Sequence, residues 1–151
     1  YVEAEPLLRR ALAIDERTLG PDHPELAPTL NGLALVYTHQ WEYEQAEPLF
    51  RRSLAIFEKA LGPEHLNVAR VLENLAGVVT ALGRYEEAEP HYGRALAILE
   101  KNLGPRHPDV AKTLESYAAV LRMIGRDAEA DRMDARARAI VDGVGEEYPA
   151  N

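Results

Sequence analysis

The chain has 151 residues, of which 46% are hydrophobic and 28% charged, and this suits a single soluble domain with a sizeable core. The absence of cysteine excludes disulfide and thiolate chemistry and is compatible with a reducing compartment, so we expect a cytoplasmic protein. A formal net charge of −8 disfavours a surface that follows nucleic-acid phosphates, and no apolar run is long enough to cross a bilayer. Neither nucleic acid nor a membrane is therefore an expected partner.

The sequence repeats itself every 42 residues. Tyr1, Tyr43 and Tyr85 align when the chain is shifted by that length, and the alignment needs no insertions. The sequence Leu-Gly-Pro-x-His recurs in the same register, beginning at Leu19, Leu61 and Leu103. A fixed period of this size predicts a solenoid, in which each unit buries its apolar face against its neighbours.

Each unit is predicted to contain two helices. Leu26, Leu30 and Leu33 recur at three- and four-residue spacing, which indicates one face of a helix, and no sustained alternation indicates strands. The predicted elements, in chain order, are a lone second helix over 1–19, helix pairs that start near 24, 66 and 108, and a terminal helix over 127–141. We therefore predict an all-α fold of about seven helices, with the repeat array over 1–141 and a flexible tail over 142–151. Because the first residue is tyrosine, we expect a fragment or a processed product.

The Leu-Gly-Pro-x-His motif ends one helix and begins the next. Gly62 can adopt a left-handed conformation that ends a helix, and Pro63 cannot continue the helix. Pro24 and Pro108 are placed where the following helix begins, because a proline in the first turn loses no intrahelical hydrogen bond.

Two features depart from these local rules. Pro48 and Pro90 fall inside the second helix of their units, so we expect a bend there or a helix that begins late. Trp41 occupies the position of Gly83 and Gly125 between the two helices of a unit. A positive φ is costly for a bulky residue, so we expect this turn to differ from the other two. The indole is expected either to fill a gap between helices or to be an exposed contact.

Five histidines raise the question of a metal site or a catalytic site. His23, His65 and His107 occupy equivalent turns. Stacked helices lie about 8–10 Å apart, whereas zinc lies about 2 Å from each ligand nitrogen. One ion cannot therefore bind all three, and we expect hydrogen bonds at helix starts or packing in the turns. His39 and His91 are isolated, and no GxSxG, GxxxxGK[ST], GxGxxG or HExxH motif occurs. We predict no enzyme activity, no cofactor and no metal site.

The apolar and small residues of each unit resemble the tetratricopeptide repeat signature. The residues that carry the resemblance are Leu30, Leu33, Ala34, Tyr37, Ala46, Phe50 and Ser53. The 42-residue period and the phrases TLNGLALVY and YEQAEPLFRRSLAIFEKALGPEH are similar to the subclass found in kinesin light chains. The resemblance implies a right-handed superhelical solenoid of antiparallel helix pairs and a non-enzymatic protein–protein interaction scaffold.

The resemblance also implies a peptide-binding groove, because in tetratricopeptide arrays the first helix of each pair lines a concave surface. The groove residues that it assigns here are Asn31, Thr38, Arg70, Asn74, Thr80, Lys112, Ser116 and Arg122. Asn74 in LENLA matches an asparagine that hydrogen-bonds a ligand's backbone, and Gly77 and Ala119 would leave room for a ligand side chain. The three bases match basic residues of the family's groove, so an acidic peptide is the expected ligand. In the alternative interpretation, Glu73 and Glu115 neutralise these bases within the helix layer.

A second function remains open from the sequence. The chain could be a structural spacer, or a self-associating fragment of a longer array in a bacterial signalling protein. The first helix has no partner in its own unit, which should leave an apolar edge. End-to-end association is the expected consequence.

Overall fold

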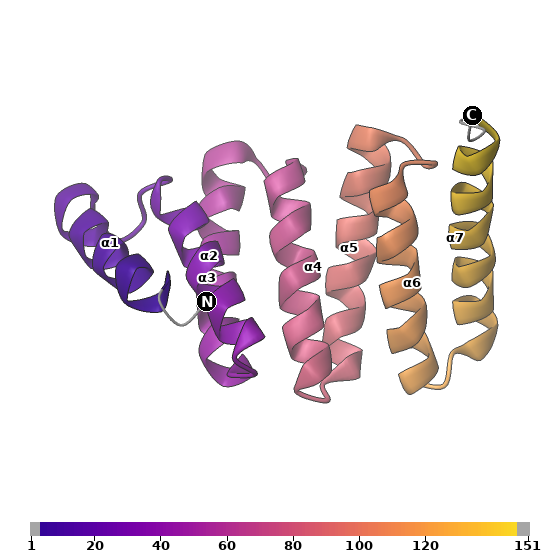
Figure 1. Ribbon diagram of the computed structural model, residues 1–151, viewed down its shortest axis with the longest axis horizontal. Coiled ribbons are helices and arrows are strands. Elements are labelled where there is room, and N and C mark those ends of the chain that lie inside the picture. Colours follow the sequence, from indigo (N-terminus) through magenta and orange to yellow (C-terminus); the bar gives the residue numbers. More distant parts are fainter. Residues whose placement is uncertain (1–3, 148–151) are drawn as a thin grey trace.

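The computed structural model describes residues 4–147, and these residues form seven α-helices and no β-strand. The helices are α1 (Ala4–Leu19), α2 (Leu26–His39), α3 (Tyr43–Leu61), α4 (Leu66–Ala81), α5 (Tyr85–Leu103), α6 (Pro108–Met123) and α7 (Asp127–Glu147). They stand side by side in chain order, with α1 at one end of the array and α7 at the other (Figure 1). The predicted all-α fold is confirmed.

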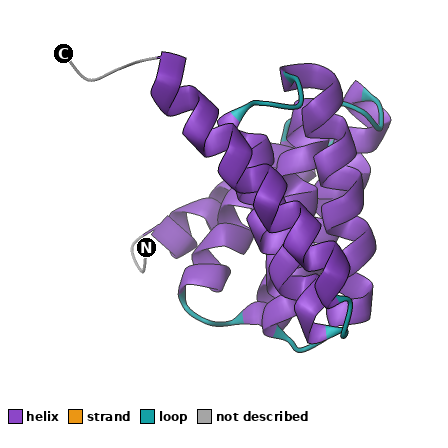
Figure 2. Ribbon diagram, turned by 90° about the vertical axis from the view of Figure 1, so that its right-hand side faces the viewer, coloured by secondary structure: helices purple, strands orange, loops and turns teal. Residues whose placement is uncertain are grey.

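Each helix packs mainly against its neighbours in sequence. The pairs α2 with α3, α4 with α5 and α6 with α7 share the most extensive contacts, and α3 with α4 and α5 with α6 join one pair to the next. The connecting loops lie at the two ends of the helices (Figure 2). Among the described residues, no helix combines the length and apolar character needed to span a membrane. The predicted solenoid of stacked helix pairs is therefore confirmed.

The core follows the apolar spacing of the sequence. Leucines and other large residues at three- and four-residue intervals are fully buried, among them Leu26, Leu30, Phe50, Leu72, Leu75 and Leu114. Small residues separate them where the helices of a pair approach closely, and Ala34 and Ala46 are completely buried. The Ser53 hydroxyl is also buried and donates a hydrogen bond of 2.7 Å to the Ala27 carbonyl of α2. A larger side chain at these positions would push the paired helices apart.

All three equivalent histidines accept a backbone hydrogen bond near a helix start, and two of them, His65 and His107, are helix N-caps. His65 Nδ1 accepts from the Asn67 amide at 3.1 Å, and His107 Nδ1 accepts from the Asp109 amide at 3.1 Å. His23 Nδ1 accepts from the Glu25 amide at 3.3 Å. The His65 and His107 rings thereby satisfy a backbone donor that the first helical turn leaves without a partner, whereas the His23 ring binds the amide of Glu25, the residue before α2. The expected hydrogen-bonding role is confirmed, and the described residues contain no group of three side chains placed to hold a metal ion.

Glycine is required where the second helix of a unit ends. The Gly62 amide donates to the Glu58 carbonyl at 3.0 Å, and the residue then turns to φ 88° and ψ 158°. The predicted positive φ is confirmed, but ψ lies in an extended region rather than in the left-handed helical one. That region is essentially closed to residues with a Cβ atom.

The prolines and the ends of two helices differ in part from expectation. Helix α3 begins at Tyr43 and α5 at Tyr85, so Pro48 and Pro90 lie inside helices that do not begin late. Pro48 is exposed, as is Glu44, so water can bind the Glu44 carbonyl that proline leaves without a donor. Helix α2 begins two residues after position 24, and α7 continues to Glu147 rather than ending near 141. The first six residues of the predicted tail are thus helical, and residues 148–151 lie outside the described part.

The turn at Trp41 was predicted to differ from the glycine turns, and this prediction is wrong. Trp41 adopts φ 63°, close to 76° at Gly83 and 78° at Gly125. The Trp41 amide donates to the Thr38 carbonyl at 3.1 Å, and the equivalent Gly83 amide donates to the Thr80 carbonyl at 2.9 Å. These hydrogen bonds satisfy the last carbonyls of the helix, and their gain outweighs the strain of a tryptophan in this conformation.

Candidate functional site

The first helices of successive pairs, α2, α4 and α6, carry the predicted groove residues, and we call that surface the inner face. Helices α2 and α4 touch directly, although they belong to different pairs. This contact brings two of the predicted residues together: Asn74 Nδ2 donates to Asn31 Oδ1 at 3.3 Å. Both side chains are half-buried. Their amide groups retain capacity for further hydrogen bonds, since each amide offers two donors and an acceptor.

Two more predicted residues meet at Tyr92 of α5. The Tyr92 side chain is buried, and its hydroxyl forms hydrogen bonds with the side chains of Thr80 and Ser116. Burial, which disfavours the phenolate, raises the pKa of Tyr92. The same hydroxyl lies 3.8 Å from the point where a methyl group on Gly77 would stand, so the protein's own tyrosine fills part of the space predicted for a ligand.

Tyr92 was not predicted as part of the site, although the repeat contained a signal. Leu8, Phe50 and Tyr92 occupy one position of the 42-residue unit, and only the third carries a hydroxyl. A polar group at a position that is otherwise apolar must find a partner when it is buried. A comparison of equivalent positions in the three repeats could therefore have predicted a polar contact at Tyr92.

Thr38 is placed apart from this cluster. Its hydroxyl donates to the Ala34 carbonyl of its own helix at 2.9 Å. Thr80 makes the equivalent bond to the Ala76 carbonyl at 2.7 Å, in addition to its contact with Tyr92. Such bonds within a helix occupy the hydroxyl donor, and a ligand would find only the oxygen as an acceptor.

Two of the predicted bases, Arg70 and Lys112, are each the fifth residue of their helix and are exposed. Within the described residues, no hydrogen bond or ion pair engages the Arg70 guanidinium, and Lys112 Nζ lies 3.7 Å from Asp109 Oδ1. A hollow of about 380 Å³ opens beside Arg70 between α4, α5 and the start of α6, and its polar lining also includes Glu73, His107 and Asp109. Arg70 and this hollow could accept an acidic side chain.

Glu73 is one of two carboxylates, with Asp109, that line the hollow beside Arg70. It is half-buried and accepts a hydrogen bond from the Thr113 hydroxyl. Burial is the main cause that raises its pKa, while Thr113, Arg70 and Lys112 act in the opposite direction. Glu115, the equivalent residue of the next repeat, is exposed. The alternative interpretation is therefore supported only in that Glu73 interacts electrostatically with the two bases.

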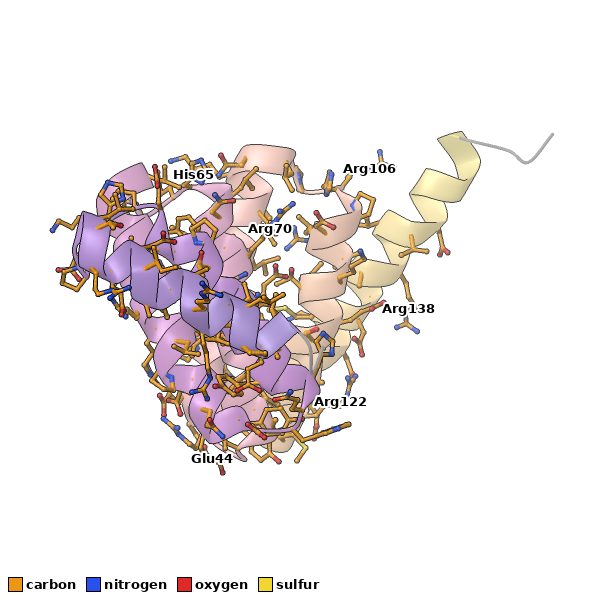
Figure 3. All side chains as sticks on the ribbon, turned by 60° about the vertical axis from the view of Figure 1, so that its left-hand side comes forward. Glu44, His65, Arg70, Arg106, Arg122 and Arg138 are labelled. Atoms are coloured by element: carbon orange, nitrogen blue, oxygen red, sulfur yellow. The ribbon has the colours of Figure 1, made fainter. Side chains whose placement is uncertain are left out.

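Arg122 is engaged by α7 instead. Its guanidinium lies 2.6 Å from Asp134 and 2.9 Å from Asp131. The neutralising carboxylates are therefore not those of Glu73 or Glu115. Arg122 also lies far along the helix direction from Arg70, which is placed in the upper half of Figure 3 while Arg122 lies near the lower edge. The expected strip of three bases is thus divided into Arg70 with Lys112 and a separate, paired Arg122.

The tetratricopeptide repeat family model matches this chain over residues 1–59, 27–101 and 68–142. The chain belongs to the tetratricopeptide repeat family. No curated protein matches it closely enough to count as a relative.

Solved structures similar to this tetratricopeptide array include kinesin light chain-like proteins. BtubC (BKLC) from P. vanneervenii has 25% sequence identity and a TM-score of 0.88, and the match covers 98% of this chain and 59% of BtubC. A putative kinesin light chain of nearly identical repeats from Podosopora anserina has 28% identity and a TM-score of 0.80, over 95% of this chain and 68% of that protein. The tetratricopeptide domain of Arabidopsis FLU has 15% identity and a TM-score of 0.69, over 78% of this chain and 95% of that domain, and shows the fold alone. The resemblance to kinesin light chain-like repeats is thereby confirmed.

Proposed function

We propose that this tetratricopeptide array is a non-enzymatic scaffold that holds an extended, acidic segment of another protein on its inner face. The observation that carries the proposal is the position of Asn31 and Asn74, which are hydrogen-bonded to each other beside the exposed Arg70. Half-buried amides next to an unengaged guanidinium are suited to a ligand that offers both a peptide backbone and a carboxylate.

Each residue has a distinct role in this proposal. Asn74 binds a backbone group of the ligand, and Asn31 fixes the orientation of the Asn74 amide. Arg70 binds a carboxylate at the mouth of the hollow, and Lys112 binds another carboxylate one repeat further along the array. Hydrogen bonds to charged groups contribute about 1.5–3 kcal/mol each. Two of them, together with apolar contacts, could support a micromolar complex, which corresponds to about −8 kcal/mol.

The proposal is tested by isothermal titration calorimetry with an unlabelled hexaglutamate peptide and with a random-sequence neutral peptide of the same length. We expect saturable binding of hexaglutamate that weakens at high salt, since the contacts are exposed charges. Arg70→Glu and Lys112→Glu should each weaken it, and Asn74→Ala should also weaken it, because that change removes a contact with the ligand's backbone. Unchanged affinity in all three variants would overturn the assignment of the inner face.

Arg122→Glu serves as the comparison for the charge changes. This substitution alters the net charge as much as Arg70→Glu does, but Arg122 is already engaged by Asp131 and Asp134. We expect Arg122→Glu to weaken hexaglutamate binding less than Arg70→Glu. Equal losses would indicate attraction to net charge alone rather than a site at Arg70.

Self-association is a second candidate function, supported by the exposed face of α1. Ile14 is 41% exposed, whereas the equivalent Ile56 and Ile98, in helices whose pairs are complete, are each 4% exposed. At the other end, α7 carries Asp134 where two inner repeats have Phe50 and Tyr92. An apolar surface does not pair with a charged one, so association would join the α1 faces of two copies rather than α1 to α7.

Sedimentation velocity at several concentrations tests this second function. Ile14→Glu should remove any concentration-dependent species, because it places a charge in the contact between the two α1 helices. Val141→Glu, which changes a 56% exposed residue at the opposite end, should leave such species unchanged. A dimer that survives Ile14→Glu would exclude association through α1.

A further inference from the structure

Trp41 has a strained backbone conformation, and its side chain packs little against the core of the protein. It has the only positive φ among the non-glycine residues of the described part of the chain, and its side chain is 77% exposed. The equivalent positions, Gly83 and Gly125, show that glycine fits this turn with the same hydrogen bonds. A large apolar residue that is both strained and exposed points to a contact outside the chain.

The next residue departs from the repeat as well. The turn reads Trp41-Glu42, whereas the other two turns read Gly83-Arg84 and Gly125-Arg126. Arg84 links its turn to the preceding unit, since its guanidinium lies 2.8 Å from Glu47 of α3. Glu42 cannot make such a link to a carboxylate, and it accepts a hydrogen bond of 2.7 Å from Gln45. At this turn the arginine link is replaced by an indole and a negative charge, and the preceding unit is contacted instead by Gln40, whose Nε2 donates to Glu5 Oε2 at 3.5 Å.

The surroundings of the indole suit a cation. The Tyr43 ring packs edge-on against Trp41, with centroids 6.2 Å apart and planes at 80°. The segment 39–45 contains Glu42 and Glu44 and no lysine or arginine. The nearby Arg9 is engaged by Glu5, at 2.9 Å, and by Tyr37. An indole face favours a Lys or Arg side chain through the quadrupole of its ring, and adjacent carboxylates strengthen the attraction.

We propose that Trp41, Glu42, Tyr43 and Glu44, which we call the Trp41 patch, bind an arginine or lysine side chain of a basic segment in a partner protein. The patch lies at the turn between α2 and α3, at the edge of the array where Glu44 is placed in Figure 3, and Arg70 lies toward the opposite edge. Its ligand has the opposite charge to the segment proposed for the inner face. The two surfaces can therefore be tested separately with peptides of opposite charge.

The natural fluorescence of the protein reports on this patch, because Trp41 is the single tryptophan of the chain. Titration with hexaarginine amide at near-physiological salt should change the Trp41 emission saturably, and hexaglutamate should not. In isothermal titration, Trp41→Gly should weaken hexaarginine binding about twofold to fivefold, the range expected for an exposed cation–π contact. The variant is expected to fold, since glycine occupies the two equivalent turns. Wild-type affinity in Trp41→Gly would overturn the proposal.

A pair of charge variants distinguishes the patch from general attraction to an acidic protein. Glu42→Arg restores the residue type of the other two turns and should weaken hexaarginine binding. Glu86→Arg makes the same change of charge at an exposed position in α5, equivalent to Glu44 one repeat along, and should have a smaller effect. Equal losses in the two variants would show that net charge, and not the Trp41 patch, attracts the peptide.

Discussion

The guanidinium of Arg122 in α6 lies 2.6 Å from the Asp134 carboxylate in α7, at a position where two inner repeats place an aromatic ring. Phe50 and Tyr92, which occupy the equivalent position, are buried among the helices. The last repeat therefore replaces an aromatic ring with a carboxylate that forms an ion pair. That pair occupies a base that the sequence assigned to ligand binding.

Release of Arg122 should make it available to an acidic ligand. We expect the double substitution Asp131→Asn with Asp134→Asn to increase hexaglutamate affinity by about threefold to tenfold, which corresponds to about 0.7–1.4 kcal/mol and is the usual net contribution of one hydrogen bond. Isothermal titration measures the change. The same substitutions in an Arg122→Ala background supply the control, because the remaining gain there reports only the loss of two negative charges. A gain of equal size in both backgrounds would contradict a role for the released guanidinium.

Substitution of Trp41 by glycine should stabilise the protein. A residue with a Cβ atom at φ 63° carries a conformational cost of about 1–3 kcal/mol, which the greater backbone entropy of glycine in the unfolded chain partly offsets. The contact with Tyr43 recovers little, since the indole is 77% exposed. We expect the free energy of unfolding to rise by about 1 kcal/mol, measured by urea denaturation followed by circular dichroism. Gly83→Ala should change it in the opposite direction, and a lower stability of Trp41→Gly would contradict this account of strain.

Replacement of Ser53 by alanine tests the polar contact in the core of the second unit. The Ser53 hydroxyl is fully buried and donates to the Ala27 carbonyl at 2.7 Å. We expect Ser53→Ala to lower the free energy of unfolding by about 0.5–1.5 kcal/mol, the usual contribution of one hydrogen bond. The fold should persist, because the equivalent position holds a fully buried Ala95 in the next unit. Ser53→Val should cost more, since its added methyl group would separate α2 and α3.

The features of the fold that the sequence predicted are those set by local chemistry repeated in each unit. Gly62 ends one helix and His65 caps the next, and each interacts with residues close to it in sequence. Their effects can therefore be predicted without knowledge of the neighbouring helices. The turn at Trp41 was mispredicted because its cost is local while its gain comes from the hydrogen bonds that close α2. A helix with both neighbours in place can impose a conformation that the isolated residue disfavours.

The site was less predictable because its polar contacts connect different repeats. The proximity of Asn31 to Asn74 depends on the direct contact of α2 with α4, and these two residues do not occupy equivalent repeat positions. The ion pairs of Arg122 depend on aspartates that belong only to the last unit. Alignment of the repeats reveals the residues that all units have in common. The contacts described above are formed by residues that occur in one unit and not in the others.

Glu73 should make the stability of the protein depend on pH in a specific direction. Burial is the main cause that raises its pKa above the ordinary value of 4.5, so the folded protein binds this proton more tightly than the unfolded chain does. The resulting stabilisation is complete below the ordinary pKa and is lost as the pH rises through the higher pKa of the folded state. Glu73→Gln is neutral at every pH and keeps an oxygen that can accept from Thr113. We therefore expect its stability advantage over wild type to be smallest below pH 4.5 and to grow to a plateau as the pH rises.

The contribution of Glu73 is isolated by comparing the stability of wild type with that of Glu73→Gln at each pH. Glu47 and Glu87 have pKa values lowered by Arg51 and Arg84, and they lose their contribution to stability as the pH falls. These groups are common to wild type and variant, so their effect cancels in the difference between the two urea denaturation curves. Glu115→Gln provides the matched control, because Glu115 is the exposed equivalent of Glu73 and burial does not oppose its charge. A constant difference between Glu73→Gln and wild type across the pH range, or an equal pH-dependent difference in Glu115→Gln, would contradict burial as the cause.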